Sequence, residues 1–313
     1  MFGRLVKWRV MNTSRRKRER NGSDQQLTEA EKSRIGSPAE TYGIYACPTC
    51  KQELELREGA LRCRVCAVTY PILDGIPDFI VEDLAENSNR SLRFIGRMDS
   101  SIRFGFMART YEACVYPLVC NLLGGWRSTS LKELAGDVSD IVGSTGGVIL
   151  DVACGPGTYG RRVASKSRTI YGIDASMSML RRGVRYVERG HIPNVHFARA
   201  KVEALPFRAG LFDAAICAGS LKHFSDTVFA LREIGRTMKM GAPLAVMCFA
   251  VSTRGEVKQG LFKYRRIRDQ LPNEGAGRIF EFSELDRYSG EAGFEDFRPH
   301  PYGAILVFSA RKK

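Results

Sequence analysis

The second half of the chain alternates short apolar runs with amphipathic stretches, and this alternation constrains the fold more than any other feature. Strands that alternate with helices are typical of a parallel sheet with crossover helices. We expect strands at residues 148–153, 169–173, 195–199, 212–217, 243–249, 294–300 and 303–310. We expect helices near residues 158–165, 176–189, 226–238 and 283–292. From Val148 onward the sequence therefore predicts an α/β domain.

A glycine-rich turn follows the first expected strand, where Gly155, Gly157 and Gly160 form the pattern Gly-x-Gly-x-x-Gly. Glycine lets the backbone turn sharply and approach a ligand closely, and the amides at the start of the next helix point to the same place. Asp174 ends the second expected strand, where a carboxylate can accept hydrogen bonds from both hydroxyls of a ribose. These features predict a nucleotide-type cofactor, either NAD or an adenosyl compound.

Further motifs favour the adenosyl cofactor. They are Asp151, four residues before the loop glycine, and the segments Glu203–Phe207, Leu211–Cys217, Leu231–Arg236 and Lys239–Gly241. With them, the chain from about Gly147 to Lys312 resembles the class I S-adenosylmethionine-dependent methyltransferases, closest to the ubiquinone/menaquinone-methyltransferase-like branch. The resemblance implies a Rossmann-like, seven-stranded, mostly parallel sheet whose last strand is antiparallel. An NAD oxidoreductase stays as a minor alternative, because the glycine pattern is shared.

The resemblance also implies a set of cofactor-binding residues. They are Asp151, Ala153, Gly155, Gly157, Asp174, Val202, Ala218 and Gly219. The first four are implied to surround the methionine end, Asp174 to hold the ribose, Val202 to cover the adenine, and the last two to lie near the sulfonium. From the residues alone there are structural alternatives: Asp151 could cap the turn after its strand, and Asp174 could be a helix N-cap. Ser176 could also fill that N-cap position.

Lys201 departs from the family pattern, which usually has Asp or Asn at that position to meet the adenine amine. A lysine side chain offers no acceptor for a hydrogen bond from an amine. We therefore expect either an adenine held by backbone groups alone or a lower affinity for the cofactor.

Four cysteines ahead of the α/β region form two Cys-x-x-Cys pairs separated by twelve residues: Cys47, Cys50, Cys63 and Cys66. Each pair places two thiolates on one side of a metal ion, and two pairs complete a tetrahedral site. Such a site has no open position, so the sequence predicts structural zinc on a hairpin around Glu58-Gly59, with two disulfides as the weaker alternative. The stretch Tyr45–Phe79 resembles the small zinc-ribbon module found as a methyltransferase activator and fused ahead of some methyltransferases.

The resulting domain prediction has four parts. These are a basic disordered tail and linker at 1–42, a zinc ribbon at 43–82, a helical substrate-side segment at 83–145, and the methyltransferase domain at 146–313. Residues 1–20 carry half of the net charge of +14. A solvated tail, a helix on an anionic membrane and an organelle transit peptide are the alternatives for this segment. Without a secretory signal, we expect a cytoplasmic protein.

His223 is the candidate catalytic residue, because it lies just past the fourth expected strand at the edge where ligands bind. It would act as a base or contact the acceptor, with a role in loop packing as the alternative. The helices expected at Tyr111–Leu123 and the basic insertion Gly255–Phe282 are predicted to set substrate selectivity.

Three functional classes remain from the sequence. The favoured one is a methyltransferase for a small apolar or lipid-like acceptor, such as a quinone, phenol or lipid. The second is an rRNA base methyltransferase of the zinc-ribbon type, which the basic charge would suit. The third is a non-catalytic module that binds the cofactor or a partner. The acceptor atom and the oligomeric state do not follow from the sequence.

Overall fold

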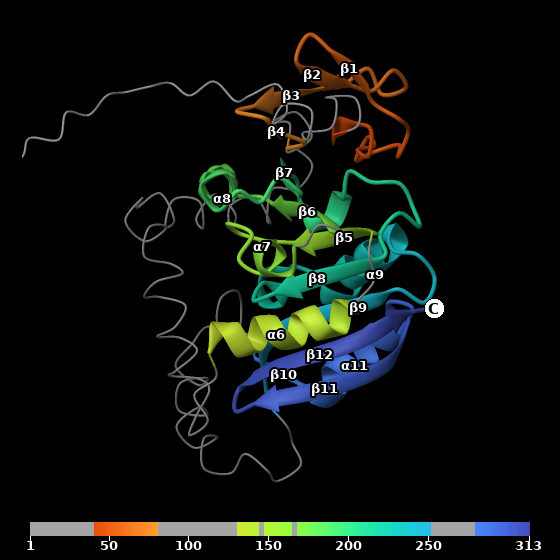
Figure 1. Ribbon diagram of the computed structural model, residues 1–313. Coiled ribbons are helices and arrows are strands. Elements are labelled where there is room, and N and C mark those ends of the chain that lie inside the picture. Colours follow the sequence, from red (N-terminus) through yellow and green to blue (C-terminus); the bar gives the residue numbers. More distant parts are fainter. Residues whose placement is uncertain (1–40, 81–129, 144–146, 165–167, 252–278) are drawn as a thin grey trace, which may run out of the picture. The chain divides into compact units, whose positions relative to one another are not determined.

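The computed structural model describes residues 41–80, 130–143, 147–164, 168–251 and 279–313 (Figure 1). The expected N-terminal tail, the helices expected at Tyr111–Leu123 and all but the last few residues of the insertion Gly255–Phe282 lie outside these residues. These residues comprise the ribbon and the α/β core.

The core is built on one large sheet. Its strands are β5 (Gly147–Val152), β6 (Arg168–Asp174), β7 (Val195–Arg199), β8 (Ala214–Ala218), β9 (Pro243–Val251), β11 (Phe294–Tyr302) and β12 (Ile305–Lys312). Their order is β11-β12-β9-β8-β5-β6-β7, with the two-residue β10 (Phe280–Glu281) paired to β9. The pairs from β7 to β9 are parallel, whereas β12 runs antiparallel to both β9 and β11. The predicted sheet with an antiparallel last strand is confirmed.

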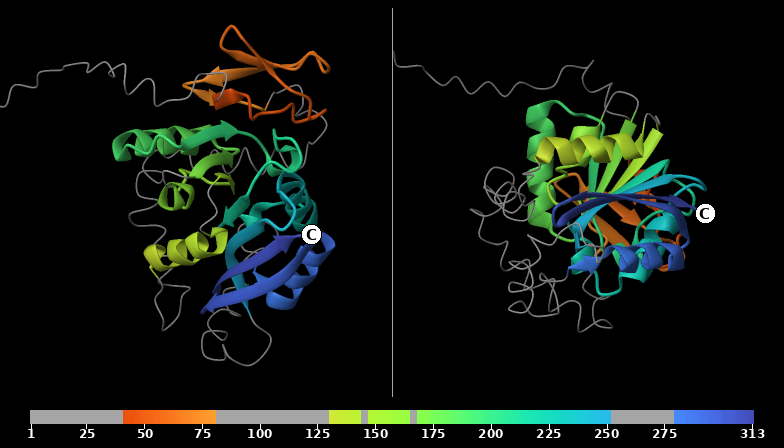
Figure 2. Two further views of the ribbon diagram at one scale, coloured as in Figure 1. Left: turned by 45° about the vertical axis from the view of Figure 1, so that its right-hand side comes forward. Right: turned by 90° about the horizontal axis from the view of Figure 1, so that it is seen from below.

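Helices cover both faces of this sheet. They are α6 (Leu131–Val142), α7 (Gly160–Val163), α8 (Met177–Gly190), α9 (Thr227–Thr237) and α11 (Phe282–Glu291). Figure 2 shows α6 and α8 on one face and α9 and α11 on the other. Helix α6 falls within the segment 83–145 that the sequence predicts to be helical, and a capping box of Ser130 and Glu133 marks its start. No helix among the described residues is long and apolar enough to cross a lipid bilayer.

The two faces of the sheet bury separate apolar clusters, because side chains alternate along a strand. Ile149 of β5 packs with Leu134 and Leu180 from α6 and α8. Its neighbour Leu150 belongs to the opposite cluster, which includes Leu231 of α9. The ribbon's own aromatic residues are part of this second cluster, so the ribbon and the core share one apolar interior.

The ribbon is a small antiparallel sheet of β1 (Glu55–Arg57), β2 (Ala60–Arg62), β3 (Thr69–Leu73) and β4 (Ile76–Pro77). Glu58 and Gly59, at φ of 50° and 74°, join β1 to β2 as the sequence predicted. Asp74 and Gly75, at 52° and 76°, make a second two-residue hairpin turn between β3 and β4. Two successive residues with positive φ are typical of type I′ turns, whose twist matches that of the paired strands.

Candidate functional site

The glycine loop after β5 has one open side and one packed side. Ala153, Gly155 and Gly157 all have positive φ, at 51°, 56° and 72°. A Cβ on Gly155 would meet nothing within 4 Å, whereas on Gly157 it would lie 2.9 Å from Cζ of Phe197. Gly155 therefore leaves space for a ligand to approach the backbone, and Gly157 lets the loop close onto the core.

Phe197 of β7 is a supporting residue that the sequence reading missed. Its ring fills a slot bounded by Gly157, Gly172 of β6 and Gly183 of α8. A Cβ on Gly172 or Gly183 would lie 2.9 Å or 2.7 Å from the ring. The signal was a glycine inside a strand pattern, which often marks a close approach of another group.

Asp151 lies at the end of β5 and is buried, with a relative exposure of 2%. Its Oδ2 accepts a hydrogen bond of 3.0 Å from the backbone N–H of Gly160, the first residue of α7. Burial raises the pKa of Asp151 to about 7, although the Gly160 hydrogen bond opposes the rise. The carboxyl group therefore makes the contact expected of a turn cap, and its pKa lies near neutral pH.

Asp174 ends β6 and holds the glycine loop from the other side. Its Oδ2 accepts a hydrogen bond of 2.8 Å from Gly155 N, and its Oδ1 accepts one of 2.8 Å from Ser176 N. Burial raises its pKa, and these backbone hydrogen bonds oppose the rise. A carboxylate has about four acceptor positions, so the group can still receive ribose hydroxyls. Ser176 does occupy the N-cap position of α8, but its side chain makes no capping hydrogen bond, and its hydroxyl lies 3.0 Å from that of Ser178.

Two further predicted residues, Ala218 and Gly219, lie at the end of β8. Gly219 donates a hydrogen bond of 2.8 Å to the carbonyl of Met247, and Ser220 Oγ donates one of 3.1 Å to the carbonyl of Ala153. The second bond ties the turn after Ala218 to the glycine loop. The other predicted residue, Val202, is buried in the 3-10 turn η3 (Val202–Ala204), directly after Lys201.

His223 ends a second 3-10 turn, η4 (Leu221–His223). Burial, followed by the charge of the neighbouring Lys222, lowers the pKa of His223 to about 4. The imidazole is therefore neutral at physiological pH, and it is a weaker base than an ordinary histidine.

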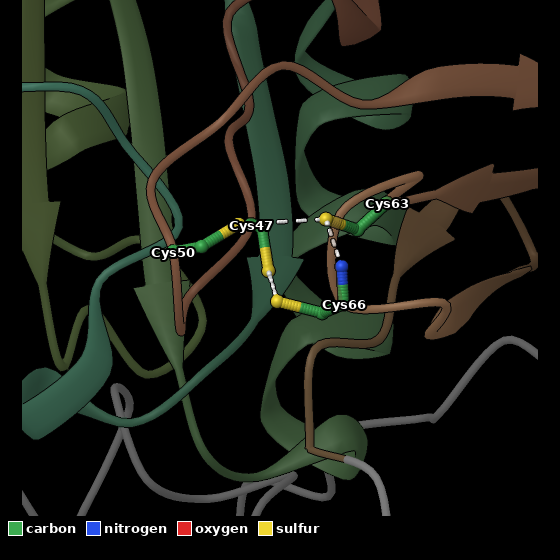
Figure 3. A group of neighbouring side chains, drawn as sticks. All are labelled: Cys47, Cys50, Cys63 and Cys66. Atoms are coloured by element: carbon green, nitrogen blue, oxygen red, sulfur yellow. Dashed lines mark hydrogen bonds between the residues drawn. The ribbon is translucent and has the colours of Figure 1, made fainter.

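The four predicted cysteine ligands come together in the ribbon, with their sulfurs directed at one another (Figure 3). All four Sγ atoms lie within 4.8 Å of one another; Cys47 and Cys66 are separated by 3.8 Å, and Cys50 and Cys63 by 3.5 Å. A tetrahedral zinc site with Zn–S bonds of about 2.3 Å requires S···S separations of about 3.8 Å. The thiols are free rather than paired in disulfides, so the donor set fits a structural Zn²⁺ ion.

The ribbon contacts the core at the segment after β7. Ala46 N donates a hydrogen bond of 2.8 Å to the carbonyl of Pro206, and Phe79 N donates one of 2.8 Å to the carbonyl of Arg199. The Arg199 guanidinium binds the buried carboxylate of Asp78 at 2.9 Å and the carbonyl of Ala175, next to Asp174, at 2.9 Å. The ribbon therefore touches the segments that the sequence assigned to the nucleoside.

A charged network makes a second connection. Lys51, the residue after the first cysteine pair, donates hydrogen bonds of 3.0 Å to the carbonyl of Leu205 and to Oε1 of Glu233. The same Glu233 oxygen accepts a bond of 3.1 Å from Leu205 N and is also held by Arg236 at 2.8 Å. The backbone C=O of Leu205 is therefore bound by Lys51 of the ribbon, and its N–H is bound by Glu233 of α9.

Comparison with known proteins agrees with this two-part geometry. Residues 149–241 match the family described as a methyltransferase domain, and residues 40–75 match the family described as Trm112p-like protein. The match to an uncharacterised chloroplastic methyltransferase of Arabidopsis thaliana, 24% identical, covers 86% of this chain and 78% of the relative. A match of that length includes the ribbon as well as the core.

Two bacterial relatives are named ubiquinone/menaquinone biosynthesis C-methyltransferase UbiE. That of Geobacter sp. (strain M21) is 27% identical over 217 residues, covering 62% of this chain and 87% of the relative. That of Hahella chejuensis is 31% identical over 193 residues, covering 60% of this chain and 74% of the relative. The chain belongs to the UbiE-like family of S-adenosylmethionine-dependent methyltransferases, and S-adenosylmethionine is its cofactor.

Proposed function

We propose that this enzyme methylates a small apolar or lipid-like acceptor of the quinone or phenol type. The observation that carries the proposal is the similarity to two relatives named as quinone C-methyltransferases, of which the chain covers 87% and 74%. In the described core β8, β5 and β6 are neighbouring parallel strands, and their carboxyl ends form the kind of edge at which ligands bind in open α/β sheets.

In this proposal the cofactor's two halves meet different residues. Asp151, Ala153, Gly155 and Gly157 receive the methionine end, and the open space at Gly155 supports this assignment. Asp174 accepts the ribose hydroxyls with the acceptor positions that Gly155 N and Ser176 N leave unused.

The adenine and the sulfonium have their own partners in the proposal. Val202 covers the adenine, and the contacts that hold Leu205 keep the backbone after Val202 in place. Ala218 and Gly219 lie near the sulfonium. Bound S-adenosylmethionine supplies an activated methyl group, so the protein's contribution is mainly alignment and exclusion of water.

We propose that His223 contacts the acceptor as a neutral hydrogen-bonding group. A pKa of about 4 supports this role over that of a general base, because a base that weak removes a hydroxyl proton poorly.

The test has two stages. Calorimetry of zinc-loaded protein should show saturable binding of S-adenosylmethionine but not of NADH, and Asp174→Ala should weaken it by about tenfold or more, because charged hydrogen bonds contribute about 1.5–3 kcal/mol. Methyl-labelled cofactor is then offered with quinols, lipid extracts and rRNA. Label in the organic extract supports the proposal. Label confined to RNA would support the rRNA base methyltransferase instead.

The N-terminal basic segment, residues 1–20, lies outside the described residues. One relative is named chloroplastic, which supports organelle targeting over a cytoplasmic location for a chain of this kind. Fusing residues 1–42 to a fluorescent protein and observing where it accumulates distinguishes targeting from a solvated tail or a membrane contact.

A further inference from the structure

Lys222 is a partly buried cation in the turn that follows β8. It lies in η4, directly after the turn that contains Gly219, and Ser220 joins this turn to the glycine loop. The carboxyl ends of parallel strands are where ligands bind in open α/β sheets. Lys222 follows Ala218 and Gly219, which are proposed to lie near the sulfonium, by only a few residues in the chain.

The Lys222 ammonium lies against an aromatic ring and is partly removed from water. Its Nζ lies 4.7 Å from the centroid of the Phe249 ring, on the neighbouring strand β9, and burial lowers its pKa. Over the described ranges of the chain, no carboxylate forms an ion pair with it. By contrast, Lys51 and Lys239 are each paired with a carboxylate, at 3.0 Å and 2.6 Å.

An aromatic ring compensates a desolvated cation only in part. A cation in this situation gains from an anionic oxygen, because hydrogen bonds between charged groups are about twice as strong as neutral ones. The neighbouring His223 is neutral at physiological pH, so Lys222 supplies the positive charge of this turn.

We propose that Lys222 binds an ionised oxygen of the methyl acceptor, so that the enzyme selects phenols and enols with an acidic hydroxyl. This inference rests on the proposed function for its acceptor class. An ionised hydroxyl makes the adjacent ring carbon more nucleophilic, which is what a C-methyltransferase requires of its acceptor. Lys222 would thus select the acceptor and hold its reactive form.

The test uses 4-nitrophenol, whose phenolate alone absorbs visible light, with zinc-loaded full-length protein. Wild type should bind the phenolate in preference to the phenol, and Lys222→Met should bind the phenolate about tenfold or more weakly, as expected for loss of a charged hydrogen bond. Lys222→Arg should retain most of the preference. Lys132→Met is the matched control, because Lys132 is an exposed residue of α6, on the face opposite α9.

Calorimetric affinity for S-adenosylmethionine, unchanged in Lys222→Met, confirms that this variant is folded. A wild type without phenolate preference, or a Lys222→Met variant that matches it, would overturn the inference. If the preference depends on Lys222 but no quinol or phenol is methylated, the proposed acceptor is wrong and the anion site stands. If a quinol is methylated with equal KM and kcat by wild type and Lys222→Met, the proposed function stands and the inference fails.

Discussion

The zinc ribbon and the cofactor edge of the core assemble their sites in opposite ways. All four metal ligands come from two turns within the short segment Cys47–Cys66. The proposed cofactor residues extend from Asp151 to Gly219 and belong to several strands and turns. A site made by local turns is specified by spacing alone, whereas a site made by a sheet edge depends on everything that packs beneath it.

The two sites are nevertheless joined. Ala46, next to the first zinc ligand, and Lys51, just after the second, both bind the segment Leu205–Pro206 of the core. Because of these contacts, we expect loss of zinc to disturb the cofactor edge. Changes at the cofactor edge should leave zinc bound, because the four ligands come from the ribbon alone.

Removal of zinc should have the largest effect. Structural zinc contributes about 10–16 kcal/mol of binding free energy in small zinc modules, so we expect the metal-free ribbon to unfold. Cys63→Ser should lose zinc and bind S-adenosylmethionine more weakly, because the contacts to Leu205 and Pro206 go with the ribbon. Metal analysis and calorimetry measure the two losses.

The control for this experiment is Cys248→Ala, which alters a buried thiol of β9 outside the cysteine cluster. It should keep its zinc. Full cofactor affinity in zinc-free protein would contradict the connection between the two sites and make the ribbon an independent module.

The pH dependence of stability should distinguish the cofactor edge from the ribbon. The pKa of Asp151 is raised from 3.8 to about 7 in the folded protein, mainly by burial. Between these values the folded state holds a proton that the unfolded state has released, so this group's contribution to stability falls as pH rises. The fall amounts to about 4 kcal/mol, since one pKa unit corresponds to about 1.4 kcal/mol.

Asp151→Asn cannot titrate and keeps an oxygen to accept the Gly160 hydrogen bond. Relative to wild type, its free energy of unfolding should therefore increase between about pH 4 and pH 7. Denaturant titrations across this range measure the difference. Parallel pH profiles for the two proteins would show that Asp151 titrates normally, as an exposed carboxyl group does.

The glycines beneath the loop should show how the cofactor edge depends on packing. In Gly183→Ala the new Cβ would lie 2.7 Å from the Phe197 ring, and overpacking of this kind costs about 1–3 kcal/mol. Gly136→Ala is a matched control in the middle of α6, where a Cβ meets nothing within 4 Å. That change should stabilise the protein by about 0.5–1 kcal/mol, the helix-propensity gain. Equal effects of the two substitutions would show that the Phe197 slot is not tight.

These contrasts explain what the sequence could and could not predict. The alternation of strands and helices, the zinc spacing and the Glu58-Gly59 hairpin are local patterns, and the structure contains all of them. The Lys51–Glu233 pair joins residues that are distant in the chain, so no local pattern indicates it. For the Phe197 slot the local signal was a glycine within a strand pattern, which does not show which side chain lies against it. Helix α6 lies within the segment predicted to be helical, but the sequence analysis gave that segment no internal bounds, and the start of α6 is marked by the capping box of Ser130 and Glu133.

The smallest expected effect concerns Lys51. Its pair with Glu233 is partly buried, with 29% and 11% of the side chains exposed, so Lys51→Met should cost only about 1 kcal/mol of stability. Zinc should stay bound, because the cysteine thiols are unaltered. The affinity for S-adenosylmethionine should nevertheless fall severalfold, because the carbonyl of Leu205 loses its hydrogen bond from the ribbon.

Arg208→Met is the control, because it breaks an exposed ion pair with Glu53 that also joins the ribbon to the core. This variant should leave the affinity for S-adenosylmethionine unchanged. Equal affinity in both variants would mean that the ribbon supports the core through its apolar contacts, and that the zinc knuckle transmits nothing to the cofactor through Lys51.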